Sequence, residues 1–595
     1  MIRISIAARP ILVGALLLTA SRARGDDAPA HTRVDLSNFA ASAAATGPRI
    51  RVPGDAGYSW LTSDDEDAPA GTFQPAPFAD IALSPELFDD LMRRVVPESS
   101  FPGVGRQLTG RSLDVWGSAE GVEHTRKSVA FLEAAYAPRL RVTASLVLAT
   151  SNGPKSIASG AVSLLPRRWT QVWWRRELHR HVAGYSLEVA QGAVVNRPTV
   201  AAVPEGGELY LRWSPGEKTS LVEVYAAEFS PLPPQHVDLS AVRNTPESSP
   251  MGVVELPRTV VTRLATTLVV PAVAKSFDFP SSGKGPSKTL TIAVAGTPEA
   301  PAAVDVGASR FRVSRVAAAA AMLEGGARES GVQDLVSKFQ ALAGTGAGVR
   351  GLETTADTFV AGEGASAELD RLRDEIVRVE ASLTPLVVGL RLLRLPFDDA
   401  LKGDGPGGSW SVGAPLSAAA AAALLDPKAP ATAAIAFPVL SGSPASTRVA
   451  VSTVAFDHLS SAVAQNAAGV QPESGAWFDG LFADKLRATA RDGGGASLSL
   501  LGNVSWVRAA AHAADLAFRT PVGLDGRSGP GTVDDPTARH VSIPLVATGE
   551  SKLDVEVAFS AAEVKDGTPI VLAALAVRDD DGKLATVLLL GTVSR

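Results

Sequence analysis

The fold is decided by residues 110–136, GRSLDVWGSAEGVEHTRKSVAFLEAAY, and by residues 139–150, RLRVTASLVLAT, which follow at once. Residues 112–117 alternate between polar and apolar side chains, as a short strand does. Residues 122–136 instead place apolar side chains at three- and four-residue steps, which is typical of an amphipathic helix. Residues 139–150 alternate again over a long stretch. The sequence therefore predicts a short strand, a helix and a long strand in this order.

The same order returns in the second half of the chain. A helix is predicted before the first unit at 84–97, and one is predicted at 332–339 before a short strand at 358–361. A strongly amphipathic helix at 366–382 and a long strand at 385–395 follow. The repetition predicts an internal duplication of a small α/β module, in which two helices cover one face of a small sheet.

Each module is followed by sequence that reads mainly as strands. Apolar side chains alternate with polar ones, and Asp581-Gly582 is a dipeptide typical of a tight hairpin turn. The predicted strands are 209–213, 221–229, 260–272, 447–454, 541–546 and 553–559, with a hairpin at 577–590 and helices at 417–425 and 478–491. The predicted fold class is therefore α+β, with tandem small α/β modules that are each followed by a β-rich antiparallel domain.

The composition excludes several classes of protein. The chain has 595 residues, of which 46% are apolar and 20% charged, so most of it can form packed cores. Its formal charge is −6 and it has no long basic run, so nucleic acid is not an expected partner. It has no cysteine, which excludes disulfide scaffolds, thiolate metal sites and cysteine nucleophiles.

The N-terminus predicts export. Arg3 and Arg9 precede the apolar run Ile11–Ala20, and small residues follow, as in a secretory signal peptide over residues 1–25. A retained membrane anchor is the alternative, although ten residues span only about 15 Å as a helix. We expect a protein of the periplasm or cell envelope, and the sequence leaves association with the membrane open.

The domain boundaries follow from these patterns. Residues 26–78, with the acidic run Asp64–Asp67, are rich in Ala, Pro, Gly and Asp and predict an extended leader. The expected domains are a signal peptide at 1–25, the leader at 26–78, module 1 at 79–150, β-rich domain 1 at 151–275, a linker at 276–312, module 2 at 313–396 and β-rich domain 2 at 397–595.

Three stretches of the first half resemble secretins, the outer-membrane channel proteins of type II and type III secretion. Residues 110–150 are similar to the ring-building periplasmic modules of that family, which have a KH-like fold. Residues 184–195, GYSLEVAQGAVV, with residues 203–213, VPEGGELYLRW, resemble its conserved β-domain. Residues 254–271, VELPRTVVTRLATTLVVP, resemble the strand of that domain that ends in two threonines, apolar residues and proline.

The resemblance covers about residues 80–275, and a degenerate second pass covers about residues 320–595. It implies a secretin-like protein, in two tandem copies, that associates with itself or with other envelope proteins. The chain departs from the family after Pro271, where AVAKSFDFPSSGKG stands in place of a Gly-rich strand. Paired amphipathic hairpins that would cross an outer membrane are not found in the sequence.

A run of tryptophans and arginines is the most unusual local composition, and it gives the candidate interaction surface. This surface consists of Arg168, Trp169, Trp173, Trp174, Arg175 and Arg176. Indole rings and guanidinium groups together are typical of a surface that binds a protein, a glycan or a membrane interface. The alternative is a half-buried strand pair whose arginines extend over the indoles.

No constellation in the sequence predicts catalysis, a cofactor or a metal. His179 and His181 share one face of a strand, but neither has an evident carboxylate partner, so we expect exposed histidines. Residues 346–351 fit G-x-G-x-x-G without the strand and helix that dinucleotide binding needs, which predicts a loop. His124 lies on the predicted module helix, where we expect a surface or partly packed histidine.

Three functions are compatible with the sequence. The first is a non-enzymatic envelope protein that assembles or scaffolds, in the manner that the resemblance to secretins implies. The second is an exported module that binds a glycan or a peptide through the Trp/Arg strand. The third is a hydrolase whose active-site residues are dispersed along the sequence.

Overall fold

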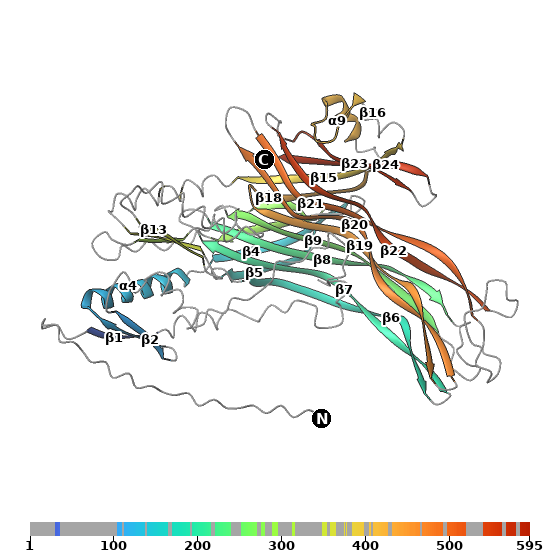
Figure 1. Cartoon of the computed structure of the whole chain (residues 1–595), viewed down its shortest axis with the longest axis horizontal. Helices are drawn as coiled ribbons and strands as arrows, with labels where there is room; N and C mark the ends of the chain where they lie inside the picture. The colour runs from blue at the N-terminus through green and yellow to red at the C-terminus, as the bar shows by residue number, and fades with distance from the viewer. Residues whose placement is uncertain are drawn as a thin grey trace.

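The computed structural model describes residues 30–35, 104–109, 112–136, 140–164, 169–190, 193–215, 220–239, 252–270, 275–279, 288–295, 312–315, 348–353, 358–363, 374, 377, 384–397, 404–405, 408–425, 431–464, 467–491, 497–518, 539–561, 567–578 and 583–594. Within these residues strands predominate, and only α4 and α9 are helices with described bounds. The predicted α+β class is therefore wrong, and the protein is β-rich. The reason is that the strands after each module are much longer than the sequence patterns indicated (Figure 1).

A three-stranded antiparallel sheet with one helix opens the described chain. It has the order β1 (Ala30–Asp35), β3 (Ser112–Gly117) and β2 (Gly105–Thr109). The helix α4 (Ala119–Tyr136) begins after Ser118, whose hydroxyl accepts a hydrogen bond from the Gly121 amide at 3.1 Å. Val122 and Val129 on α4 are buried, and the helix contacts β1 and β3. The predicted strand at 112–117 and the helix after it are confirmed.

The second half contains a three-stranded sheet of the same connectivity. Its order is β12 (Arg312–Arg315), β14 (Thr358–Glu363) and β13 (Gly348–Glu353). As in the first sheet, the last strand in sequence is central and pairs antiparallel with both others. Asp374 and Val377, which follow the central strand, are helical, as α4 is after β3.

The long strand after each helix is central in a four-stranded antiparallel sheet. The sheets have the orders β10-β11-β4-β5 and β18-β15-β24-β23. When the strands of the two halves are matched in chain order, with β4 to β15, β5 to β18, β10 to β23 and β11 to β24, these two orders are the same. The strands are β4 (Leu140–Thr150), β5 (Gly153–Leu164), β10 (Lys275–Phe279) and β11 (Lys288–Ala295) in the first sheet, and β15 (Pro385–Pro396), β18 (Ala431–Leu440), β23 (Ile570–Arg578) and β24 (Leu584–Ser594) in the second.

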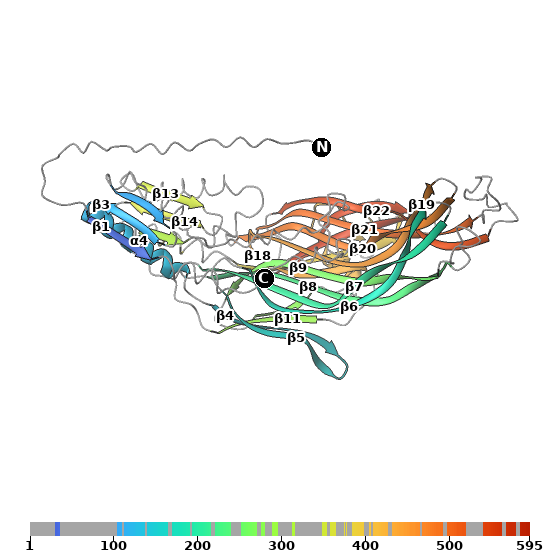
Figure 2. The same cartoon turned by 90° about the horizontal axis from the view of Figure 1, so that it is seen from below.

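Eight longer strands form one large sheet, in which those of the two halves lie side by side (Figures 1 and 2). They are β6 (Trp169–Ala190), β7 (Ala193–Pro215), β8 (Ser220–Asp238) and β9 (Val253–Val270), then β19 (Pro444–Ala464), β20 (Ala467–Arg491), β21 (Ser497–Phe518) and β22 (Arg539–Ala561). Within each half, consecutive strands pair antiparallel, and β9 pairs with β19 across the halves.

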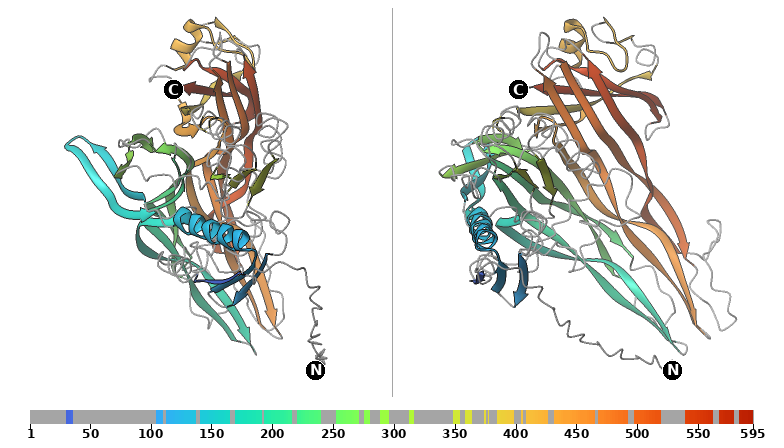
Figure 3. Two further views of the ribbon diagram at one scale, coloured as in Figure 1. Left: turned by 90° about the vertical axis from the view of Figure 1, so that its left-hand side faces the viewer. Right: turned by 60° about the vertical axis from the view of Figure 1, so that its left-hand side comes forward.

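In each set of four long strands, the two middle strands pair over only part of their length, and we call this part the base. Beyond the base, each set continues as two separate hairpins (Figure 3). In the first half, β7 and β8 pair only over 206–215 and 220–229, whereas β6 pairs with β7, and β8 with β9, far beyond these residues. In the second half, β20 and β21 likewise pair only over 480–491 and 497–507. Gly206 stands where β7 leaves β8, and its φ of 114° is one that glycine adopts readily.

The halves therefore agree strand by strand: three short strands, a helix, two strands, four long strands and a final hairpin. The second half differs by an insertion between β15 and β18, which holds β16 (Asp404–Gly405), β17 (Gly408–Ser409) and α9 (Ala418–Leu424). The helix predicted at 417–425 is α9, and the Ser417 hydroxyl caps it by accepting from the Ala420 amide at 3.2 Å.

One hydrophobic core contains side chains of both halves. It includes Trp213 and Leu264 from the first half and Leu390 and Leu500 from the second, all essentially inaccessible to solvent. The opposite face of β7, β8 and β9 has its own cluster, in which the rings of Tyr210 and Tyr225 lie 6.0 Å apart. Because both faces of this base are buried, its strands are apolar at successive positions.

Three further expectations from the sequence are wrong. The leader at 26–78 contains β1, and the linker at 276–312 contains β11, which pairs with β4 along its whole length. The helix expected at 478–491 is the end of β20, because a bulge between Asp484 and Arg487 breaks the two-residue period. The hairpin predicted at 577–590 is confirmed as β23 and β24. Residues 1–25, the acidic run at 64–67 and the predicted helices at 84–97 and 332–339 lie outside the described residues.

Candidate functional site

The Trp/Arg run lies on the edge strand of the large sheet. Trp169, Trp173, Trp174, Arg175 and Arg176 are all on β6, and their backbones pair with β7. Their side chains are not described, and Arg168 lies outside the described residues. Over the described residues, β6 pairs with β7 alone. The strands β5 and β20 lie close to β6 without pairing with it, so this edge is a candidate for pairing with a further strand.

The opposite end of the large sheet is the base of β22. Residues 550–561 of β22 pair with β21, and no other pairing of this segment occurs among the described residues. The single bridge between β22 and β19, Leu545 with Phe456, lies farther along the strand. We call residues 169–178 of β6 and 550–561 of β22 the two open edges.

The two halves are joined by β9 and β19, the strands that correspond to β22 and β6 in the other half. β9 and β19 pair antiparallel from Arg258 opposite Thr453 to Ala265 opposite Ser446. Since β19 has the place in its half that β6 has in the first, and β9 the place of β22, the junction joins a β22-type edge to a β6-type edge. The Thr447 hydroxyl also donates to the Arg263 carbonyl oxygen across the junction at 2.9 Å.

The base of the sheet holds buried charges. Arg212 on β7 and Glu223 on β8 are directly opposite, and the Arg212 Nε donates to Glu223 Oε1 at 2.8 Å. A second contact, from Arg212 Nη2 to Glu223 Oε2, makes the pair bidentate. At the junction, Arg448 lies with its guanidinium carbon 4.8 Å from the Phe482 ring centroid. The side chains of Arg212, Glu223 and Arg448 are buried within the sheet.

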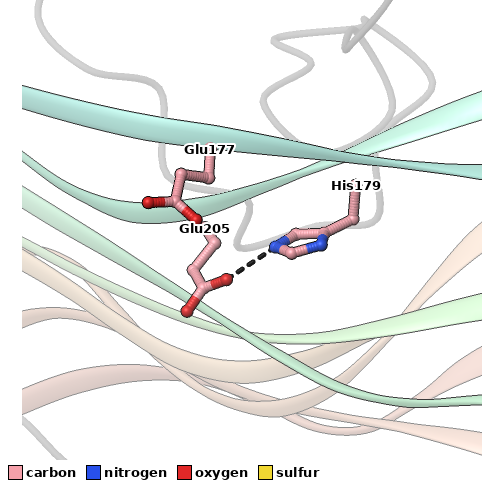
Figure 4. Close-up of side chains that lie close together, drawn as sticks. All are labelled: Glu177, His179 and Glu205. Atoms are coloured by element: carbon pink, nitrogen blue, oxygen red, sulfur yellow. Dashed lines mark hydrogen bonds and ion pairs between the residues drawn. The ribbon is translucent and has the colours of Figure 1, made fainter.

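His179 takes part in a cluster that the sequence did not reveal. His179 and Glu177 are two apart on β6, and Glu205 lies on β7 directly opposite Glu177. The His179 Nε2 lies 2.6 Å from Glu205 Oε2, and one ligand atom from each residue lies within 4.8 Å of the others (Figure 4). One carboxylate of the cluster, Glu177, is close to His179 in the sequence, and the other, Glu205, comes from the next strand.

His181 joins the two hairpins of the first half. Its Nδ1 lies 2.8 Å from Glu255 Oε2 on β9, and its side chain is 15% exposed. The Tyr185 hydroxyl accepts a hydrogen bond from the Gly252 amide at 2.7 Å close by. His181 is therefore partly buried between strands, and the expectation of an exposed histidine is wrong for it.

His124 on α4 is more deeply buried than the surface or partly packed histidine that the sequence predicts. It is 4% exposed, and burial, reinforced by Lys127 and Arg106, lowers its pKa from 6.5 to about 4. Glu123, its neighbour on α4, is exposed and paired with Arg126, which lowers the pKa of that carboxyl. The lowered pKa keeps the imidazole of His124 neutral at pH 7.

The glycine motif at 346–351 is not a phosphate loop. Gly348 and Gly351 are on the strand β13, so the predicted loop is wrong for this part, and Gly346 lies outside the described residues. Among the described helices, none combines the length and apolar character needed to cross a membrane.

Comparison with known proteins adds little. No family model matches the sequence, and the search of curated proteins gives no match. A weak structural neighbour is a chain in the atomic model of the Salmonella SPI-1 type III secretion injectisome basal body proteins InvG, PrgH and PrgK. The two are 11% identical with a TM-score of 0.18, over 35% of this chain and 54% of that chain. The present chain thus matches about half of that chain's length, and this likeness does not establish a shared function.

Proposed function

We propose that this protein is a non-enzymatic building block of the cell envelope that joins further copies of itself, edge to edge, into a closed ring or barrel. The observation that carries the proposal is the β9–β19 junction. In it a β22-type edge pairs with a β6-type edge, and among the described residues each molecule has one open edge of each type, which supports pairing between copies.

Such pairing is heterologous, since the two surfaces that meet are different. A heterologous contact repeats from copy to copy and closes into a ring when the rotation allows it. The unpaired backbone groups of both edges would then be satisfied by the neighbouring copy, as they are at the junction.

The charges of the two open edges favour the same pairing. Residues 550–561 contain Glu550, Asp554 and Glu556 with Lys552, which gives −2. Residues 169–178 contain Arg175 and Arg176 with Glu177, which gives +1. Opposite charge at two surfaces speeds and orients their encounter. The Trp/Arg strand of the first half is, on this proposal, an assembly edge.

The location at the envelope rests on the N-terminal sequence pattern and on the resemblance of residues 110–150 and 184–271 to secretins. A glycan- or peptide-binding module remains the second candidate, because an open strand such as β6 also accepts an extended peptide.

Cysteine cross-linking tests the proposal directly, because the chain contains no cysteine of its own. One cysteine is placed on β6 between residues 172 and 176 and one on β22 between residues 552 and 556, and the pairs are scanned. Opposed residues of antiparallel strands are close enough for a disulfide. We expect at least one pair to give a ladder of multimers under oxidising conditions. As a positive control, Thr262→Cys with Val449→Cys, which are opposed at the junction, should cross-link within one molecule.

Charge reversal provides a second arm. Arg175→Glu with Arg176→Glu should shift the mass seen by light scattering toward the monomer. Arg180→Glu, on the same strand but beyond the open edge, is the matched control and should not. A wild-type protein that stays monomeric at all concentrations, together with no intermolecular cross-link from any pair, would refute the proposal.

A further inference from the structure

The cluster of Glu177, His179 and Glu205 is built by two neighbouring strands whose register holds it together. Glu177 and Glu205 are opposed on β6 and β7, and His179 projects from the same face of β6 as Glu177. In Figure 4 the imidazole and both carboxylates converge on one small region. The side chains of His179 and Glu205 are 42% and 49% exposed, so a solute ion can reach them.

The register places two carboxylates opposite each other. Glu177 on β6 and Glu205 on β7 are directly opposed, and like charges in this position on antiparallel strands repel each other. A cation held between these carboxylates and the imidazole of His179 would reduce that repulsion.

The distances suit a small metal ion. In a tetrahedral site with bonds of about 2.0–2.1 Å, ligand atoms lie about 3.3–3.4 Å apart. The three atoms of the cluster are within 4.8 Å of one another, and the 2.6 Å contact of His179 with Glu205 needs to lengthen by less than about 1 Å. Small side-chain rotations therefore suffice.

A fourth position is open beside the cluster. A pocket of about 250 Å³ is lined by Glu177 and Glu205 together with Lys155, Gly206 and Gly207. It has room for a water ligand or for a group of a bound partner. Three protein ligands with an open fourth position are typical of accessible zinc sites.

We propose that Glu177, His179 and Glu205 bind a divalent transition-metal ion, for which zinc is the first probe. The imidazole nitrogen favours zinc and its neighbours over calcium and magnesium, which prefer oxygen ligands alone. The ion would tie β6 to β7 next to the open edge. The proposal does not depend on assembly.

The test is a titration of the full-length metal-free protein with Zn²⁺ against a chromophoric chelator, followed by Co²⁺ for its coordination-sensitive absorption. We expect one equivalent to bind tightly, and we expect His179→Gln and Glu205→Gln each to weaken binding at least about tenfold. Circular dichroism shows whether the variants remain folded. The matched control is His236→Gln, an exposed histidine on β8 outside the cluster.

The outcomes are distinct. Loss of binding in the two cluster variants, with the control unchanged and Co²⁺ absorption of a nitrogen- and oxygen-ligated ion, supports the site. Failure of the wild type to compete with the chelator, or equal weakening in His236→Gln, overturns it. Light scattering of the same variants reports assembly separately, so the failure of one proposal is distinguishable from that of the other.

Discussion

Removing Arg212 should destabilise the base of the large sheet strongly. Its guanidinium forms a bidentate pair with Glu223, and the two side chains are 10% and 12% exposed. At an effective dielectric constant of about 20, charges in such contact attract by about 4 kcal/mol. Arg212→Met removes the guanidinium and leaves the Glu223 carboxylate buried. We expect this change to lower the free energy of unfolding by about 3–5 kcal/mol.

The assay is urea unfolding followed by tryptophan fluorescence, since Trp213, next to Arg212, is fully buried. We expect a clearly lower midpoint for Arg212→Met. The double variant Arg212→Met with Glu223→Leu should recover most of the loss, because two apolar side chains replace the pair without leaving a charge. Arg126→Met, which breaks an exposed pair on α4, should not change the midpoint measurably. The reasoning is refuted if the double variant is as unstable as Arg212→Met.

Two further changes test the packing of the module and of the second half. Because the folded pKa of His124 is about 4 and its ordinary value is 6.5, the unfolded chain binds the proton first; stability falls as the pH drops from about 6.5 to about 4. His124→Leu should flatten this part of the pH dependence of unfolding, and an unchanged slope would show that other groups cause it. A Cβ at Gly480 would clash with the Val449 carbonyl oxygen and with Ala450, so Gly480→Ala should cost about 1–3 kcal/mol in urea unfolding. Wild-type stability of this variant would mean that β19 and β20 are less closely paired.

Local sequence patterns predict the secondary structure correctly where an element has one apolar and one polar face. Residues 112–136 give β3 and α4, because the period changes from two to 3.6 at Ser118, which caps the helix. At the end of β20 the sequence pattern predicts a helix, because residues 481–483 are buried on both faces and Lys485, with a φ of 49° at a bulge, breaks the alternation. There the spacing of apolar residues imitates a helix.

Long-range pairing could not be read from the sequence. The carboxylate that contacts His179 is 26 residues away, and the one that contacts His181 is 74 residues away, each on another strand. The sequence predicts a leader and a linker where β1 and β11 lie, because β1 pairs with the distant strand β3, and β11 pairs with the distant strand β4 as well as with the neighbouring β10. The open edges follow from the order of strands in the sheet, which no local pattern contains.

The fusion of two equivalent halves in one polypeptide limits the stoichiometry of anything they build. In a closed assembly through the open edges, every second joint would be the β9–β19 junction within one molecule. Each molecule would contribute eight strands, so the number of four-stranded units would always be even. The units also alternate strictly. The histidine–carboxylate cluster of the first half and the α9 insertion of the second would each recur at every other unit, and such a ring would have half the rotational symmetry of one made from a single repeated unit.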